Sequence, residues 1–260
     1  MTGEYDLIFS IGEACSCSQS IRAARLQYAS FPWDWLLLPT LPGRARMICE
    51  GFGDWLLEED MRRISDNGDT DQYENTRNGI LFYHDFPKGV PLAESFPAVK
   101  AKYDRRIARL TRLIEEAKRP ILVVRVDSPA KASVPATLDD CRLCREMLSR
   151  RWPGKSFEMC LFSMDRGRRF SDRLEEEPEE GLLHVAFDYA SRVPDAPAFA
   201  VDLPTMGAFL RARFSVRDYR TPGEMREYKA LRKRRKYAKE GVRGFWGLLL
   251  KRARKHLHLT

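Results

Sequence analysis

The sequence lacks a membrane-spanning segment, a signal peptide and a disulfide framework. None of its apolar runs approaches the roughly 20 residues that a transmembrane helix needs. The first residues do not combine a basic segment, an apolar segment and a small-residue cleavage site. Its six cysteines are irregularly spaced over 260 residues, unlike those of small secreted domains. We therefore expect a cytoplasmic protein with reduced thiols.

The motifs of several common enzyme classes are missing as well. No G-x-x-x-x-G-K-[ST] or G-x-G-x-x-G loop is present, so nothing indicates nucleotide binding. The G-x-S-x-G of serine hydrolases is also missing. Cys141 and Cys144 form a C-x-x-C inside an expected helix, whereas a zinc site needs a second such pair. We expect both to face the core, and we expect no metal or cofactor.

Charge is concentrated at the end of the chain. The net charge is +8, but residues 224–260 hold thirteen Lys or Arg and three Asp or Glu, which is +10 and leaves −2 for the rest. An apolar stripe with Trp246 and Leu250 runs beside these basic residues. This pattern is typical of a basic amphipathic helix on an anionic membrane surface. There are two alternatives: the basic tail binds a nucleic acid, or it is solvated and has no partner.

Alternating helical and strand patterns predict an α/β fold with a mainly parallel sheet flanked by helices. Residues 99–118 have apolar side chains at three- and four-residue steps, which predicts a helix. Another helix is expected over 137–152, with Thr137 as its N-cap. Three apolar runs predict buried strands: residues 121–126, 156–164 and 182–189. We expect one α/β domain over residues 1–205, followed by a basic helical tail over 206–260.

Three segments interrupt this alternation. Residues 30–43 hold three prolines and two tryptophans, which predicts a packed, irregular segment. Residues 63–79 are polar and rich in turn residues, and residues 173–181 are strongly acidic. Both compositions predict surface loops.

A cysteine lies where the first expected strand gives way to a helix. The apolar residues 7–9 are followed by Gly12 and then by Cys15, close to the expected helix start. Unpaired N–H groups and the helix dipole at such a position lower the pKa of a thiol. The same N–H groups can hold an oxyanion. The alternative is that Cys15 and Cys17 are small residues filling a tight junction.

One of the four histidines is placed as a general base would be. His84 follows the expected strand 79–83 and precedes Asp85, so a carboxylate is at hand to orient it. Because adjacent residues of a strand point to opposite faces, Asp34 and Asp127 are alternatives to Asp85. His184, inside the run 182–189, is expected to be a buried or half-buried strand residue.

An arginine interrupts an otherwise apolar strand. Arg125 follows Ile121 to Val124, and a charge inside a buried strand is costly unless it is paired. It also lies toward the carboxyl end of the strand, where open α/β sheets bind ligands. Arg125 therefore binds an anionic substrate group or pairs with Asp34 or Asp85. Arg109, on the preceding helix, is a further basic candidate.

Five motifs in order resemble a bacterial family called "putative papain-like cysteine peptidases". They are SIGEAC at 10–15, FPWDW at 31–35, NGILFYHDF at 78–86, YDRRIARL at 103–110 and ILVVR at 121–125. The resemblance covers roughly residues 5–165 and implies that Cys15 is the nucleophile and His84 the base. PWD stands where the family has PFD, which leaves Asp34 in place. The family's label implies a papain-like α+β fold as the alternative to repeated βαβ units.

Two hypotheses for the function follow. The first is a cysteine-dependent hydrolase, similar to a peptidase or amidase, with Cys15 and His84 as the catalytic pair and Asp85 or Asp34 as the orienting carboxylate. Its substrate contacts would be Trp35, Arg109 and Arg125. The second is a non-catalytic domain that binds a sugar-phosphate or another anionic ligand, and that the basic tail attaches to the inner membrane surface.

Overall fold

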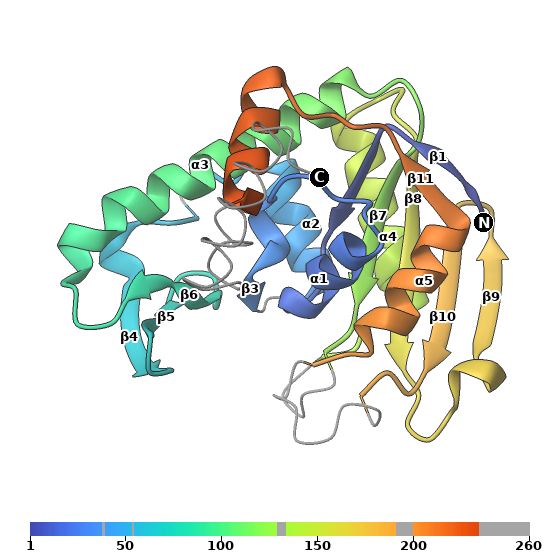
Figure 1. The fold of residues 1–260 in the computed structure, drawn as a ribbon, viewed down its shortest axis with the longest axis horizontal. Helices are drawn as coiled ribbons and strands as arrows, with labels where there is room; N and C mark the ends of the chain where they lie inside the picture. Colours follow the sequence, from blue (N-terminus) through green and yellow to red (C-terminus); the bar gives the residue numbers. More distant parts are fainter. Residues whose placement is uncertain (38–39, 54, 129–133, 191–199, 234–260) are drawn as a thin grey trace, which may run out of the picture. The chain divides into compact units, whose positions relative to one another are not determined.

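The computed structural model describes residues 1–37, 40–53, 55–128, 134–190 and 200–233 (Figure 1). Contacts divide the chain into two units, Met1–Asp218 and Tyr219–Thr260. The first unit includes α5 (Leu203–Arg213), which packs on α1 (Cys15–Ala23). The contacts thus extend this unit past residue 205, where the sequence placed the domain boundary.

In the second unit, residues 222–233 are helical. The apolar stripe expected around Trp246 lies outside the described residues. No helix in the described part of the chain is long and apolar enough to cross a membrane. Attachment of the tail to a membrane surface therefore stays a prediction.

The largest sheet confirms the α/β fold and its mainly parallel strands. Its order is β2-β7-β8-β10-β9, and only β9 runs antiparallel to its neighbour. The strands are β2 (Leu7–Ser10), β7 (Ile121–Val126), β8 (Phe157–Met164), β9 (Leu174–Glu179) and β10 (Leu182–Phe187). Every residue of β7 is buried, which explains its continuous apolar run.

Helices flank this sheet (Figure 1). α1 and α5 pack together, as do α2 (Leu41–Cys49) and α4 (Leu138–Arg151). Thr137 caps α4 as expected, since its side chain accepts from Asp140 N while the Asp140 carboxylate accepts from Thr137 N. α3 (Leu92–Glu116) begins before the expected start at residue 99 and continues through Pro97.

A second, antiparallel sheet corrects the expectation of a loop over residues 63–79. Its order is β3-β6-β5-β4, with β3 (Leu36–Leu37), β4 (Met61–Asp66), β5 (Thr70–Asn75) and β6 (Leu81–Pro87). β4 and β5 form a hairpin whose turn includes Gly68 at φ 95°. Most of β4 is exposed, so its polar composition resembled that of a loop.

The expectation of a loop over the acidic segment 173–181 was also wrong. This segment contains β9, at the edge of the main sheet. Edge strands tolerate charge on their open side. The remaining strands, β1 (Gly3–Tyr5) and β11 (Phe214–Val216), pair in parallel. Three short 3-10 helices complete the first unit's described elements: η1 (Pro32–Asp34), η2 (Glu58–Asp60) and η3 (Phe170–Asp172).

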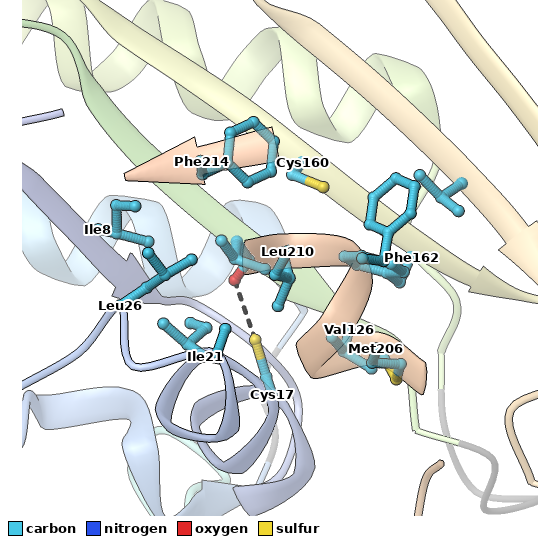
Figure 2. Packing of buried hydrophobic residues seen from close by; sticks show 14 of the residues in the cluster. Ile8, Cys17, Ile21, Leu26, Val126, Cys160, Phe162, Met206, Leu210 and Phe214 are labelled. Carbon is cyan, nitrogen blue, oxygen red and sulfur yellow. Dashed lines mark hydrogen bonds between the residues drawn. The ribbon is translucent and has the colours of Figure 1, made fainter. Parts of the chain in front are cut away.

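Cys17 belongs to the apolar core between the main sheet and the helices α1 and α5 (Figure 2). Its side chain is fully buried, and its thiol donates to Val124 O at 3.2 Å. Burial raises the pKa of this thiol to about 11. Cys17 is therefore a small core residue, which was one of the two interpretations of the cysteines at this junction.

Replacing Gly12 by alanine is expected to lower the free energy of unfolding by about 1–3 kcal/mol, the usual cost of overpacking a core. A Cβ at Gly12 would lie 2.2 Å from Cys17 Cβ and 2.8 Å from its Sγ. The matched control is Gly53→Ala, because a Cβ at Gly53 has no atom within 4 Å. Urea unfolding measures both variants, and equal midpoints would contradict the close packing of Gly12 on Cys17.

Candidate active site

Cys15 is the first residue of α1, directly after the loop that leaves β2. The N-cap residue, Ala14, has extended backbone and no side-chain acceptor to take up the first N–H groups of the helix. The backbone N–H groups of Cys15 and Ser16 interact with the sulfur and favour its thiolate form. The thiol is half-buried, so this helix start can present it to a substrate.

Burial nevertheless raises the pKa of the Cys15 thiol, and the two N–H groups offset that effect only in part. The sequence led us to expect a lowered pKa from the helix start alone. Desolvation disfavours a thiolate, and here it is the larger effect. Cys15 is therefore a protonated thiol near neutral pH, and a nucleophilic role requires a base that removes its proton.

The side of α1 that carries Cys15 faces the segment of Asp34 and Trp35. Ser18 and Arg22 follow Cys15 at three and seven residues, so the three side chains form one stripe of the helix. Ser18 Oγ donates to the backbone oxygen of Asp34 at 2.9 Å. Arg22 Nη2 donates to Asp34 Oδ2 at 2.5 Å. Both contacts place the Cys15 stripe against the FPWDW motif.

Trp35 joins this stripe to His84. The Arg22 guanidinium lies 5.2 Å from the Trp35 ring centroid. The His84 ring packs edge-on against Trp35, with centroids 6.2 Å apart. His84 lies inside β6 and is exposed. Among the described residues no hydrogen bond joins Cys15 to His84. The link between them is indirect, because Trp35 contacts His84 and also Arg22, which follows Cys15 on the same stripe of α1.

Asp34 organises the FPWDW motif. It is fully buried, and its Oδ2 accepts from Arg22 Nη2, from Gln27 Nε2 at 2.8 Å and from Phe31 N at 2.9 Å. Burial raises the pKa of this carboxyl although Arg22 and these donors oppose the shift. Asp34 therefore holds α1 against the segment that carries Trp35.

The other two carboxylates proposed to orient His84 also have partners of their own. Asp85 forms an ion pair with Lys102 and accepts from Tyr103 Oη at 2.9 Å. Both partners belong to α3, so Asp85 ties β6 to that helix. Asp127 binds an arginine, described next. In the described part of the chain, no hydrogen bond joins Asp34, Asp85 or Asp127 to His84.

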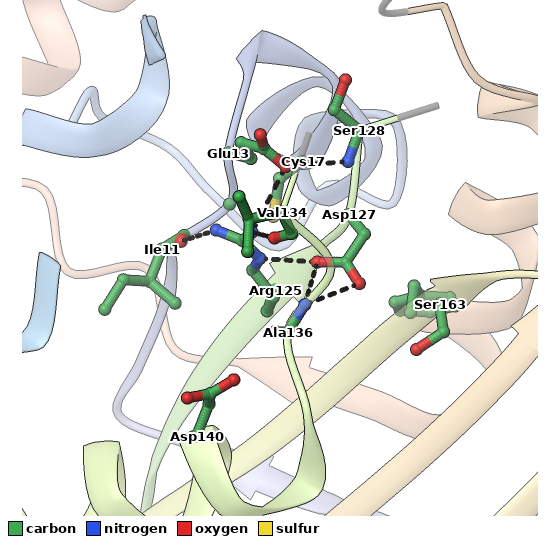
Figure 3. Close-up of polar contacts among 12 residues, drawn as sticks. Ile11, Glu13, Cys17, Arg125, Asp127, Ser128, Val134, Ala136, Asp140 and Ser163 are labelled. Carbon is green, nitrogen blue, oxygen red and sulfur yellow. Dashed lines mark hydrogen bonds and ion pairs between the residues drawn. The ribbon is translucent and has the colours of Figure 1, made fainter. Parts of the chain in front are cut away.

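Arg125 is enclosed in a buried charge network at the carboxyl ends of β2 and β7 (Figure 3). Its Nε donates to Asp127 Oδ1 at 2.8 Å, and its Nη2 donates to Glu13 Oε2 at 3.3 Å. Asp127 also accepts from Ala136 N. The side chain is fully buried. Arg125 thus pairs as a structural charge, but with Asp127 and Glu13, because Asp34 and Asp85 are bound elsewhere.

Two further charged residues support the loop before Cys15, and sequence reasoning missed both. Glu13 pairs with Arg125. The fully buried Arg44 donates to Glu13 O at 3.1 Å and to Leu36 O at 3.0 Å. Arg44 therefore links this loop to β3. The signal in the sequence was weak, since Glu13 only precedes the cysteine and Arg44 lies in an ordinary helix.

Two other basic or aromatic candidates lie near the site. Trp35 is half-buried beside His84. Arg109 Nη1 donates to Ser30 O at 2.9 Å, just before the FPWDW motif. Arg109 thereby fastens α3 to the segment that precedes Trp35.

Cys141, Cys144 and His184 were expected to be structural residues. Cys141 and Cys144 are fully buried on α4, as expected of core-facing residues. Burial raises the pKa of Cys141 to about 12. His184 is half-buried in β10, with Nε2 3.0 Å from Ser163 Oγ, which confirms it as a strand residue.

A comparison with protein families matches residues 6–167 to the family described as "Putative papain-like cysteine peptidase". The matched range contains Cys15, His84 and the three carboxylates considered above. No curated protein and no solved structure matches the chain. The family's description supports a cysteine hydrolase at a coarse level.

Proposed function

The chain belongs to the family described as "Putative papain-like cysteine peptidase", and from this premise we propose that Cys15 attacks a substrate carbonyl while His84 takes the thiol proton. The observation that carries the proposal is the position of Trp35. It packs on His84 and under Arg22, on the side of α1 that begins with Cys15. Trp35 and His84 join two of the family-like motifs, and Ser18 and Arg22 hold the helix that begins with Cys15 against the first of these.

Because the Cys15 thiol is protonated near neutral pH, its proton must leave as the sulfur attacks. The new bond joins Sγ to the carbonyl carbon, and the carbonyl electron pair moves to oxygen. The N–H groups of Cys15 and Ser16, which already interact with the sulfur, are the donors nearest to that oxyanion. His84 then returns the proton to the departing amine or alcohol, and water releases the acyl group from Cys15.

The two carboxylates act as positioning residues in this mechanism. Asp34 fixes the Cys15 stripe against Trp35 through Arg22. Asp85 fixes β6 to α3 through Lys102 and Tyr103, on the strand position next to His84. Loss of either carboxylate would therefore misplace the His84 imidazole, although neither carboxylate touches it.

Acyl transfer from p-nitrophenyl acetate tests the proposal without knowledge of the natural substrate. We expect a stoichiometric burst of p-nitrophenolate and an acetyl group on the peptide that contains Cys15. Cys15→Ser should lose the burst. The matched control is Cys49→Ser, because Cys49 is also half-buried but lies at the end of α2. A full burst from Cys15→Ser would refute the proposal.

A further inference from the structure

The helix over residues 222–233 is exposed along its second half, where every residue from Arg226 to Lys233 is exposed. Helices of this length are marginal in water, and most gain their stability by packing an apolar face. Among the described residues, five large apolar side chains are exposed, and two of them, Tyr228 at 38% and Leu231 at 53%, lie on this half. The helix therefore offers apolar side chains to a partner.

The two exposed apolar side chains belong to one face of the helix. Tyr228 and Leu231 lie three residues apart, so their side chains are neighbours. Met225, which is half-buried, precedes Tyr228 by the same step and extends this face. The Arg220 guanidinium lies over the Tyr228 ring, 4.2 Å from the centroid, and a cation over one side of a ring is attracted to it. The apolar face thus has a positive charge at its edge.

Basic side chains form a second stripe beside the apolar face. This basic stripe consists of Lys229 and Arg232, each of which directly follows one of the exposed apolar residues. Residues 226–233 hold four Lys or Arg and one Glu, which is a net charge of +3. Apolar and basic stripes side by side are typical of helices that lie in the interface of an anionic bilayer. The apolar groups enter the lipid there, and the cations contact the headgroups.

We propose that the helix over residues 222–233 docks on an anionic lipid bilayer, with Tyr228 and Leu231 in the headgroup boundary and the basic stripe on the lipid phosphates. The charge of residues 224–260, thirteen basic against three acidic, is complementary to such a surface. A nucleic acid would account for the charge alone. Stacking on bases would use the Tyr228 ring but leave Leu231, the more exposed of the two, without a contact. The bilayer accounts for both stripes.

Cosedimentation of the full chain with lipid vesicles tests the docking. We expect vesicles of equimolar phosphatidylcholine and phosphatidylglycerol to bind at least tenfold more tightly than vesicles of phosphatidylcholine. The double variant Tyr228→Gln with Leu231→Gln, which introduces a good helix former, should bind the anionic vesicles at least tenfold more weakly. The matched control is Leu143→Gln, because Leu143 is 44% exposed but lies on α4 of the first unit. This control should bind as the wild type does.

A further variant separates loss of the apolar face from damage to the helix. Tyr228→Trp keeps an aromatic ring that suits the bilayer interface and should retain the wild-type affinity. A loss in Tyr228→Trp as large as that of the double variant overturns the proposal. Equal affinity of the double variant and the wild type, or no preference for the anionic vesicles, overturns it as well. Binding to duplex DNA without binding to vesicles does the same and assigns a nucleic acid instead.

Discussion

Arg125→Met is expected to lower the free energy of unfolding by about 3–5 kcal/mol, the usual cost of removing one partner of a buried ion pair. The change leaves the carboxylates of Asp127 and Glu13 enclosed without their cation. It also frees the loop before Cys15 from the end of β7. Urea unfolding measures the loss, with the exposed Arg105→Met as control, for which we expect a change of no more than about 0.5 kcal/mol.

The loss should depend on pH with a definite sign. Burial raises the pKa of Asp127, and Arg125 is the main group opposing that rise. A carboxyl whose pKa is raised in the folded state stabilises the fold below its unfolded pKa and loses that contribution as pH rises through the folded pKa. Without Arg125 the pKa of Asp127 rises further. Arg125→Met should therefore approach wild-type stability in acid and differ most at neutral pH, and a pH-independent difference would contradict this.

His84→Ala is expected to slow the acylation of Cys15 by p-nitrophenyl acetate about 10²–10⁴-fold at pH 7, the range for losing a general base. The reason is the raised pKa of the Cys15 thiol, which leaves little thiolate without help. Stopped-flow measurement of the burst gives the rate.

The pH profile and one control distinguish a base from a structural residue. As pH rises above the pKa of the thiol, thiolate forms without assistance, so the rates of His84→Ala and the wild type should converge. His184→Gln, altered in β10, should acylate at the wild-type rate throughout. A wild-type rate from His84→Ala at pH 7 would show that His84 takes no proton from Cys15.

The parallel strands were predictable because burial on both faces demands continuous apolar residues. β7 and β8 show this in the runs 121–126 and 156–164. β4 and β9 were missed because each is polar and lies at a sheet edge. Edge strands obtain their hydrogen bonds from one neighbour, and that pairing leaves little trace in local composition.

The candidate site was predictable in its residues but not in their pairing. The motifs indicated Cys15, Trp35 and His84, which lie at the start of α1, at the end of η1 and in β6. The sequence did not reveal that burial at the helix start outweighs the N–H groups around Cys15. It also did not reveal that Asp34 and Asp85 bind Arg22 and Lys102 instead of the imidazole. These ion pairs join residues of different helices and strands, and no sequence motif contains both partners.

A double-mutant cycle on Cys15 and His84 measures directly whether the two side chains act together. The hydrolysis rate of p-nitrophenyl acetate is compared among the wild type, Cys15→Ala, His84→Ala and the double variant. If His84 serves Cys15, His84→Ala lowers the rate about 10²-fold or more with Cys15 present and leaves it unchanged in Cys15→Ala. The same fold loss in both backgrounds would contradict a shared role and remove His84 from the mechanism.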